Sequence, residues 1–276
     1  MSNVLVTGAS TGIGRATALL LDEHGFTVFA GVRKQSDADS LGAAASNRLV
    51  PLILDVTDAQ QIAAAGEAIS AAIGTEGLAG LVNNAGIASA APLEFVSAED
   101  LRHQLEVNVV GQLEVTKAVL PLLRLAKGRI VNVTSIGGLI AGTMLGPYNA
   151  SKFALEAVTH TLRQELAPWG IEVIAVEPGR IATPIWSTSA ASADRMLDPV
   201  REAATEFYGA QIAAAQRMAI DAAKNGLPPL EVAKAIERAL TAGKPRTRYP
   251  VGRDAKIGSA LIARLPDRLR DRLLSR

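Results

Sequence analysis

Tyr148 and Lys152 are the residues of this sequence whose types and spacing most directly indicate chemistry. They lie four positions apart, and residues i and i+4 share one face of a helix, so the phenol and the ammonium point the same way. A free tyrosine has a pKa of about 10, which is too high for efficient proton transfer near neutral pH. Because a neighbouring ammonium favours the phenolate, we expect Lys152 to lower the pKa of Tyr148 and make it an acid/base catalyst.

A serine and an asparagine extend this pair. Ser135 follows the β-rich run Val131–Thr134, 13 positions before Tyr148, where its hydroxyl could hydrogen-bond a substrate oxygen and stabilise developing negative charge. Asn108 falls inside a long helical pattern at 99–127, although its side chain competes for backbone hydrogen bonds and makes asparagine a poor interior helix residue. Taken alone, YxxxK fits a surface helix pair and Asn108 fits a solvent-facing residue, but the combination is specific.

The segment Thr7–Gly14 reads TGASTGIG and stands between the first apolar run and the first helical pattern. Gly8 permits a tight turn, Gly12 lets the backbone approach a pyrophosphate, and Gly14 lets the helix pack close to the sheet. Backbone N–H groups at the start of the helix would meet the anion, helped by the helix dipole. The segment therefore predicts a dinucleotide-binding turn, although glycine-rich turns often serve only as turns.

Short β-rich runs alternate with helical patterns along the chain, which indicates right-handed βαβ units and a parallel sheet. Most runs are apolar on both faces, as strands buried between helix layers should be. The expected strands are Val4–Thr7, Thr27–Val32, Leu49–Leu54, Gly80–Asn83, Arg129–Thr134, Glu172–Glu177 and, more weakly, Thr247–Val251. The expected helices span 13–24, 58–73, 99–127, 148–167, 195–224 and 229–242. We expect a single domain over 1–276, an α/β fold with a doubly wound, Rossmann-like parallel sheet of about seven strands and helices on both faces.

Two segments depart from this alternation. Residues 185–228 carry isolated bulky side chains and no strand, and because they follow the sixth expected strand they would lie over the carboxyl ends of the strands, where ligands bind. We expect a substrate-binding lid there, with a helical insertion for packing or oligomer contacts as the alternative.

Residues 253–276 hold seven basic and three acidic side chains, and their leucines, interrupted by Pro266, predict two short helices. This basic amphipathic tail could cover the pocket or lie on a membrane, but we favour docking on the protein's own surface.

The bulk composition argues against several classes of function. The 276 residues are 49% hydrophobic and carry a formal net charge of +1, so nothing points to a nucleic-acid partner. The absence of cysteine rules out disulfides and thiolate metal sites, and the three histidines lack the spacing of metal ligands. No signal-peptide pattern and no apolar stretch of about 18 residues occurs. We expect a cytoplasmic protein with no metal and no membrane association.

The spacing TGxxxGxG, together with YxxxK downstream of Ser135, resembles the short-chain dehydrogenase/reductase family in its single-domain branch. The resemblance covers residues 3–184 well and the remainder loosely. It implies that Ser135 orients the substrate, that Tyr148 exchanges the proton, and that Lys152 also holds the nicotinamide ribose. It further implies that Asn108 marks a kink in its helix and binds a water linking the lysine to solvent. The implied catalytic residues are Asn108, Ser135, Tyr148 and Lys152.

The resemblance also implies where a nicotinamide cofactor binds. Asp55 and Val56, at the end of the third expected strand, would hold the adenine, and Asn83–Gly86 (NNAG) would line a ribose. The segment Pro178–Thr183 (PGRIAT) matches the family's PGxxxT and would hold the carboxamide. Helix capping by Asp55 and plain turns in the other two segments are the alternatives. The expected cofactor contacts are Gly8, Ser10, Thr11, Gly12, Ile13, Gly14, Arg33, Asp55, Val56, Asn84, Ala85, Gly86, Asn108, Tyr148, Lys152, Pro178, Gly179, Ile181 and Thr183.

The end of the second expected strand bears on the choice of cofactor. Family members that prefer NAD carry an aspartate at the position of Val32, because an acid there hydrogen-bonds the ribose 2′-hydroxyl. Arg33 resembles the basic residue of members that prefer NADP, since a cation there pairs with a 2′-phosphate. We therefore expect NADP(H). Asp37 and Asp39 keep NAD(H) open, and Arg33 could instead be a solvated surface cation.

Together these inferences predict an oxidoreductase that transfers a hydride between a nicotinamide and a ketone or secondary alcohol. Apolar side chains in 185–228 and in the loop Ile136–Ile140 favour a hydrophobic small-molecule substrate, and 247–256 loosely resembles members that act on steroids or retinoids. A non-enzymatic NADP-sensing protein and a sugar-nucleotide epimerase or dehydratase are the alternatives. The first would have lost the tyrosine or the lysine, and the second does not fit the TGxxxGxG spacing. The resemblance also implies a homodimer or homotetramer assembled through 99–127 and 148–167.

Overall fold

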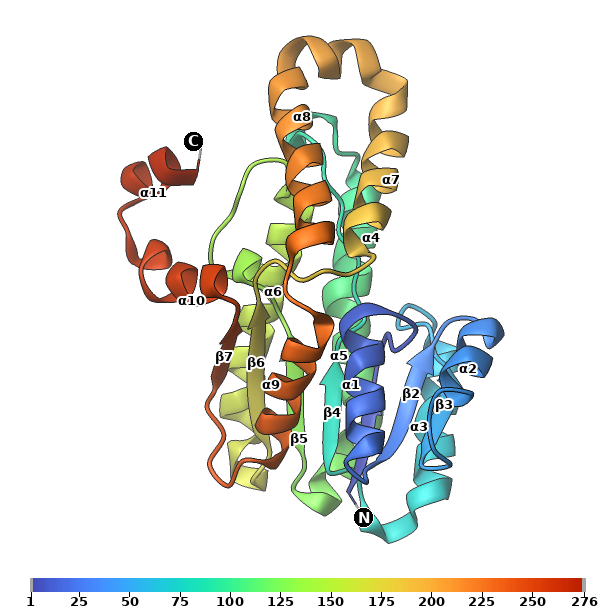
Figure 1. Cartoon of the computed structure of the whole chain (residues 1–276). Helices are drawn as coiled ribbons and strands as arrows, with labels where there is room; N and C mark the ends of the chain where they lie inside the picture. The colour runs from blue at the N-terminus through green and yellow to red at the C-terminus, as the bar shows by residue number, and fades with distance from the viewer. Residues whose placement is uncertain (1, 275–276) are drawn as a thin grey trace.

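The computed structural model describes residues 2–274. A sheet of seven parallel strands in the order β3-β2-β1-β4-β5-β6-β7 forms its centre (Figure 1). From β1 the chain first builds one side of the sheet and then crosses to β4, so the expected doubly wound α/β sheet is confirmed. The carboxyl ends of β1 and β4 flank this switch point, where such folds bind ligands. The strands are β1 (Asn3–Val6), β2 (Thr27–Val32), β3 (Leu49–Ile53), β4 (Gly80–Asn83), β5 (Arg129–Val133), β6 (Glu172–Pro178) and β7 (Arg248–Val251).

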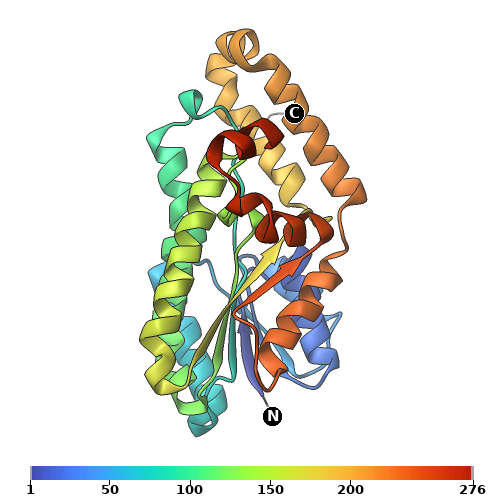
Figure 2. The ribbon, with the colours of Figure 1, turned by 90° about the vertical axis from the view of Figure 1, so that its left-hand side faces the viewer.

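Helices cover both faces of the sheet (Figures 1 and 2). The helices α1 (Gly12–Glu23), α2 (Gln35–Gly42) and α9 (Pro229–Thr241) pack on one face. The helices α3 (Ala59–Ile73), α5 (Gly111–Ala126) and α6 (Gly146–Leu166) cover the other face, with α4 (Ala98–Leu105) next to α6.

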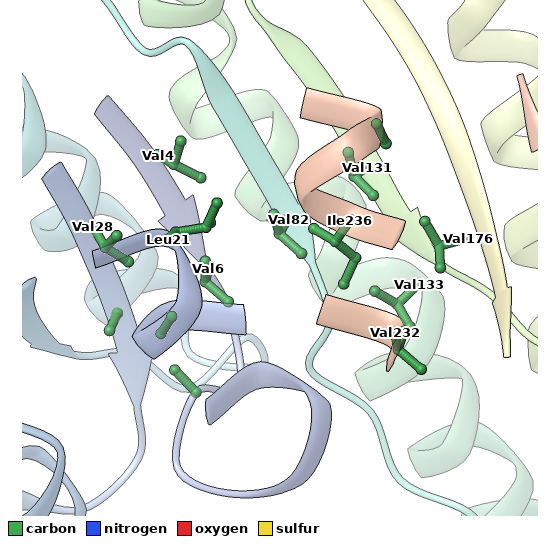
Figure 3. Close-up of a cluster of buried hydrophobic side chains, with 14 of the residues drawn as sticks. Val4, Val6, Leu21, Val28, Val82, Val131, Val133, Val176, Val232 and Ile236 are labelled. Atoms are coloured by element: carbon green, nitrogen blue, oxygen red, sulfur yellow. The ribbon is translucent and has the colours of Figure 1, made fainter. Parts of the chain in front are cut away.

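Alternation along the strands divides the core into these two layers. Val4 and Val6 of β1 lie with Leu21 of α1 and Ile236 of α9 in one cluster of buried side chains (Figure 3). Leu5, which lies between the two valines in the sequence, belongs to the cluster on the opposite face. Successive side chains of a strand point to opposite faces, so a strand that is apolar at every position is buried on both sides.

The helices differ from the sequence predictions in three places. The helix expected at 99–127 is interrupted by a π-helical turn, Glu106–Val110, and such turns often mark functional sites. The helix α2 was not predicted, because its polar sequence buries only two side chains. The single helix expected at 195–224 is wrong: α7 (Ile185–Leu197) and α8 (Arg201–Asn225) are separated by the turn Asp198–Val200. Pro199 in that turn cannot donate a helical hydrogen bond.

Two helical segments lie beyond the carboxyl edge of the sheet. The helices α7 and α8 rise from it as a pair (Figure 1), and α10 (Arg253–Ala260) and α11 (Asp267–Leu274) follow β7 and lie at the β7 side of the sheet, beyond the end of that strand (Figures 1 and 2). Pro266 separates the last two helices, as the sequence predicts. None of the helices within residues 2–274 is both long and apolar enough to cross a lipid bilayer.

Candidate active site

A cavity of about 610 Å³ opens at the carboxyl ends of the strands. One part of its wall is made by the loops that follow the strands, and the other part by side chains of α7, α8 and the tail. The structure brings nearly all the sequence-predicted cofactor residues to this cavity. The predicted residues in its wall are Gly8, Ser10, Thr11, Gly12, Ile13, Arg33, Asp55, Val56, Asn84, Ala85, Gly86, Tyr148, Lys152, Pro178, Gly179, Ile181 and Thr183.

The glycine-rich turn leads directly into α1. Gly12 has a φ of +56°, in the left-handed region that favours glycine. A Cβ on Gly12 would also lie only 3.2 Å from the Thr183 side chain, so there is little room for a larger residue. A Cβ on Gly14 would lie 2.2 Å from the carbonyl oxygen of Gly8, so Gly14 allows the close packing expected of it without lining the cavity. No side chain caps the N-terminus of α1 and no acidic residue occupies its first turn. Its first N–H groups are therefore suited to an anion.

Hydrogen bonds from the end of β4 hold this turn in place. The side chain of Asn84 donates to the carbonyl oxygens of Thr7 at 2.9 Å and Gly8 at 3.1 Å. The Thr7 hydroxyl accepts hydrogen bonds from the backbone N–H groups of Asn84 and Ala85 at 3.0 Å each. The NNAG segment thus supports the glycine-rich turn and is more than a plain turn.

Asp55 is not the cap of the following helix. Its carboxylate accepts hydrogen bonds from the backbone and the hydroxyl of Thr57, while Asp58 caps α3 by accepting from Gln60 and Gln61. Asp55 lines the cavity within this local turn.

Ser135, Tyr148 and Lys152 line one wall of the cavity. The Lys152 ammonium lies 5.8 Å from the centroid of the Tyr148 ring, so the helix places them on one face as predicted. Its Nζ donates to the carbonyl oxygen of Val133 at 2.9 Å. The Ser135 hydroxyl accepts from the backbone N–H of Gly137 at 3.0 Å, which fixes it at the end of β5.

The pKa of Tyr148 does not follow the sequence prediction. Burial raises its pKa above 10, and the Ser135 side chain only partly offsets this rise, so the expectation of a lowered value is wrong for the protein alone. Burial also lowers the pKa of Lys152 to about 8, against the opposing effect of Glu156. Desolvation disfavours the charged form of both groups, and it is the largest cause of both pKa shifts.

Asn108 stands behind the wall and does not line the cavity. It is fully buried in the π-helical turn. Its Nδ2 donates to the Ser151 hydroxyl at 2.9 Å and to the carbonyl oxygen of Ile87 at 3.0 Å, and its Oδ1 accepts from the Ile87 N–H at 2.9 Å. The side chain therefore ties the loop after β4 to α6, and the solvent-facing alternative is wrong.

The remaining wall is mainly apolar. Ile136 and Ile140 extend from the turn after β5, and Trp186 and Met218 come from α7 and α8. The Trp186 indole donates to the carbonyl oxygen of Ile181 at 2.7 Å, which orients the ring beside the cofactor segment. The tail contributes Gly258, Ile262 and Leu274, cavity positions that sequence reasoning did not single out. Their only signal was the near-helical spacing of the tail's apolar residues.

The chemistry of the wall fits a nicotinamide dinucleotide. It offers an uncapped helix N-terminus for a pyrophosphate, an exposed arginine, Arg33, near the end of β2, and hydroxyl and ammonium groups at the ends of β5 and α6. The glycines that approach Thr183 and the Gly8 carbonyl oxygen keep this surface free of bulk.

Comparisons with known proteins agree with this geometry. A family model described as short chain dehydrogenase matches residues 2–194. Retinol dehydrogenase 5 of Mus musculus is 39% identical over 99% of this chain and 87% of the relative. The 17-beta-hydroxysteroid dehydrogenase type 6 of Homo sapiens is 38% identical, and the match covers 99% of this chain and 87% of the relative. The NADPH-dependent 3-dehydrocapnine reductase of Ornithobacterium rhinotracheale is 36% identical, and the match covers 99% of this chain and 96% of the relative.

Solved structures show the same arrangement of the chain. A short-chain dehydrogenase from Streptomyces avermitilis superposes with a TM-score of 0.77 at 32% identity, covering 93% of this chain and 90% of the other. A short chain dehydrogenase from Burkholderia cenocepacia, in complex with NADP, gives a TM-score of 0.75 at 29% identity, covering 99% and 97%.

Proposed function

The chain belongs to the short-chain dehydrogenase family and is an oxidoreductase that acts on CH–OH groups with NAD(P)+. On that premise we propose that it interconverts a hydrophobic alcohol, of steroid or retinoid type, with its carbonyl form, using NADP(H) as the preferred cofactor. One observation carries the proposal: Ser135, Tyr148 and Lys152 line the same cavity as the glycine-rich turn and an extended apolar wall.

The catalytic roles follow from the placement of these side chains. In reduction, Tyr148 donates its proton to the substrate oxygen, while Ser135 donates a hydrogen bond to the same atom as negative charge builds there. In oxidation the deprotonated Tyr148 takes the proton from the substrate hydroxyl, and Ser135 holds the same oxygen. Because burial raises the pKa of Tyr148, the neutral phenol predominates at neutral pH, which suits donation. Lys152 places a positive charge beside the phenol and holds the nicotinamide ribose. The cofactor, when bound, supplies or accepts the hydride.

Arg33 supports the preference for NADP(H). Its side chain is exposed, lines the cavity and forms no ion pair with any residue of 2–274, so it is available for a 2′-phosphate. Val32, at the position where an acid would bind a 2′-hydroxyl, is apolar and buried. Neither Asp37 nor Asp39 lines the cavity, and Asp39 accepts a hydrogen bond from Gln35. NAD(H) remains usable at lower affinity.

The apolar wall supports the class of substrate. A cavity lined by isoleucines, a tryptophan and a methionine, with few polar groups near the reacting oxygen, suits a large hydrophobic alcohol. Two of the relatives named above are a retinol and a hydroxysteroid dehydrogenase. In this proposal α7 and α8 form the lid over the substrate, and the tail closes the far side of the cavity.

Purified protein tests the proposal directly. Absorbance of the reduced nicotinamide should report turnover with a retinoid or a hydroxysteroid, and more slowly with a short secondary alcohol, with NADP favoured over NAD. Tyr148→Phe serves as the inactive control. Turnover confined to short polar alcohols would overturn the substrate class, and a preference for NAD of more than tenfold would overturn the role of Arg33. Tight NADP binding without turnover of any compound would favour the NADP-sensing alternative.

We further propose a homodimer or homotetramer that uses the surface of α5 and α6. Val110, the last residue before α5, and Phe153, on α6, are 41% and 44% exposed, which leaves two large apolar side chains for an interface. Light scattering on the wild type and on Phe153→Glu checks this. A monomeric wild type contradicts it.

A further inference from the structure

A cluster of buried charge follows Lys152 along α6. Glu156 and His160 come from α6 itself, Glu177 from β6 and Arg248 from β7. The Arg248 guanidinium donates to Glu156 at 2.8 Å and also contacts Glu177 and His160. Glu156 is 4% exposed and Glu177 is fully buried. None of these four side chains lines the cavity, so the reaction described above does not use them directly.

Glu156 is placed to act on the lysine. It lies four positions after Lys152, on the same face of the helix, and side chains of a helix lean towards its N-terminus. A Cβ added to Gly138 would lie 3.0 Å from the Cγ of Glu156, so the acid packs against the turn that follows Ser135. Its Oε1 is buried and has no hydrogen-bond partner among residues 2–274.

The charges of the cluster are unequal without the lysine. Two buried carboxyl groups face one guanidinium. Burial raises the pKa of Glu177 while the contact with Arg248 opposes that rise, and burial and Arg248 lower the pKa of His160, which keeps it neutral at neutral pH. Arg163, the other cation on this face of α6, acts on His160. The Lys152 ammonium is therefore the group that can balance the second carboxylate, and an unbalanced buried charge is costly.

We propose that Glu156, held by Arg248, is a positioning residue that keeps the buried Lys152 in its ammonium form. The importance of Glu156 for catalysis rests on the proposed function, in which the Lys152 ammonium lies beside the Tyr148 phenol and would hold the nicotinamide ribose. The direction of the effect agrees with the physical chemistry of the site, in which burial lowers the pKa of Lys152 to about 8 and the charge of Glu156 opposes that fall.

Carbon-13 NMR of protein labelled at lysine Cε measures this directly, without cofactor or substrate. The Lys152 signal is identified by its absence from Lys152→Arg, and it should titrate near pH 8 in the wild type. In Glu156→Gln the midpoint should fall by about one pH unit, because an opposite charge has been removed. In Arg248→Gln it should rise, because Glu156 loses its competing cation. Glu165→Gln, the same change at an exposed site on α6, is the matched control and should leave the midpoint unchanged.

The opposite shifts of the Lys152 midpoint expected in Glu156→Gln and Arg248→Gln distinguish a positioning role of Glu156 from a purely structural one. Loss of packing alone would disturb both variants in the same direction, whereas the proposal requires the midpoints to move apart. An unchanged midpoint in Glu156→Gln overturns it. If that variant does not fold, Glu156→Asp, which keeps the charge, must fold and keep the wild-type midpoint, and Arg248→Gln must still raise it.

The pH profile of turnover then tests the consequence for catalysis. The alkaline loss of reductive activity should begin at lower pH in Glu156→Gln than in the wild type and at the wild-type pH in Glu156→Asp. A wild type without turnover would contradict the proposed function and leave the NMR result standing. Shifted midpoints with identical pH profiles would contradict the link to catalysis.

Discussion

The two halves of the cavity are built in different ways. The half that we propose binds the cofactor, the cofactor half, consists of loops at the strand ends, held by hydrogen bonds such as those from the Asn84 side chain to the carbonyl oxygens of Thr7 and Gly8. The half that we propose binds the substrate, the substrate half, consists largely of helices with few anchors. Of the 25 residues of α8, only Ala204 and Ala222 are buried.

The attachment of α8 to the rest of the molecule is correspondingly local. Tyr208 donates a hydrogen bond to Glu94 at 2.7 Å and meets the ring of Phe95 edge-on, while Phe207 and Ile220 are 61% and 68% exposed. The residues of the cofactor half are therefore constrained by the backbone conformation of its loops. In the substrate half, side chains can change without disturbing the sheet. Binding chemistry on loops and attached helices often varies in this way on a constant scaffold.

The largest effect should come from Tyr148→Phe, which removes the acid/base and leaves both halves of the wall in place. We expect turnover to fall by about 100- to 10,000-fold, the range of general acid–base catalysis, while NADPH affinity changes little. Steady-state rates and fluorescence titration of NADPH check this. Substantial residual turnover would place the proton transfer on another group.

The cofactor half also buries a charge, and its energetic cost depends on pH. The pKa of Lys152 falls from 10.5 to about 8 on folding, so between these values the unfolded chain binds more protons than the folded one. Stability relative to Lys152→Met should therefore rise as the pH goes from 8 to 10.5, by about 3 kcal/mol in total, and stay level below pH 8. Urea unfolding of both proteins from pH 7 to 10.5 measures the difference. Parallel curves would contradict a buried ammonium.

Arg33→Ala should act on one half alone. Loss of a charge-assisted contact worth about 1.5–3 kcal/mol corresponds to a 10- to 100-fold loss of NADP affinity, with NAD affinity unchanged. Binding titrations with both cofactors measure it. The matched control is Arg15→Ala, at a cation that donates to Ser40 and does not line the cavity. Equal losses of affinity for NADP and NAD would show that Arg33 does not bind the 2′-phosphate.

The smallest effect should come from Met218→Ala in the substrate half. Removing apolar surface from the wall should raise the KM for a steroid or retinoid about 5-fold, which corresponds to about 1 kcal/mol, and leave the KM for NADPH unchanged. Phe207→Ala, on the same helix but outside the cavity wall, is the control. A raised KM for NADPH in Met218→Ala would show that the two halves are coupled.

The cofactor half could be predicted almost completely from the sequence, because strand ends, glycines and the Tyr–Lys spacing are local signals. Four features of the molecule could not. The turn around Pro199 splits a helix that the apolar pattern makes continuous, and the polar sequence of α2 gives no periodic signal. The raised pKa of Tyr148 depends on burial by segments far away in the chain, which no local pattern records. The contribution of Leu274 to the cavity is likewise a matter of tertiary packing.

The wall of the cavity joins Gly8, near the beginning of this sequence, to Leu274, near its end. During synthesis the glycine-rich turn leaves the ribosome before the tail residues that complete the apolar wall. Because domains can begin to fold while the chain is still being made, a nascent chain arrested before residue 253 would already hold the cofactor turn and yet lack part of the wall around the substrate.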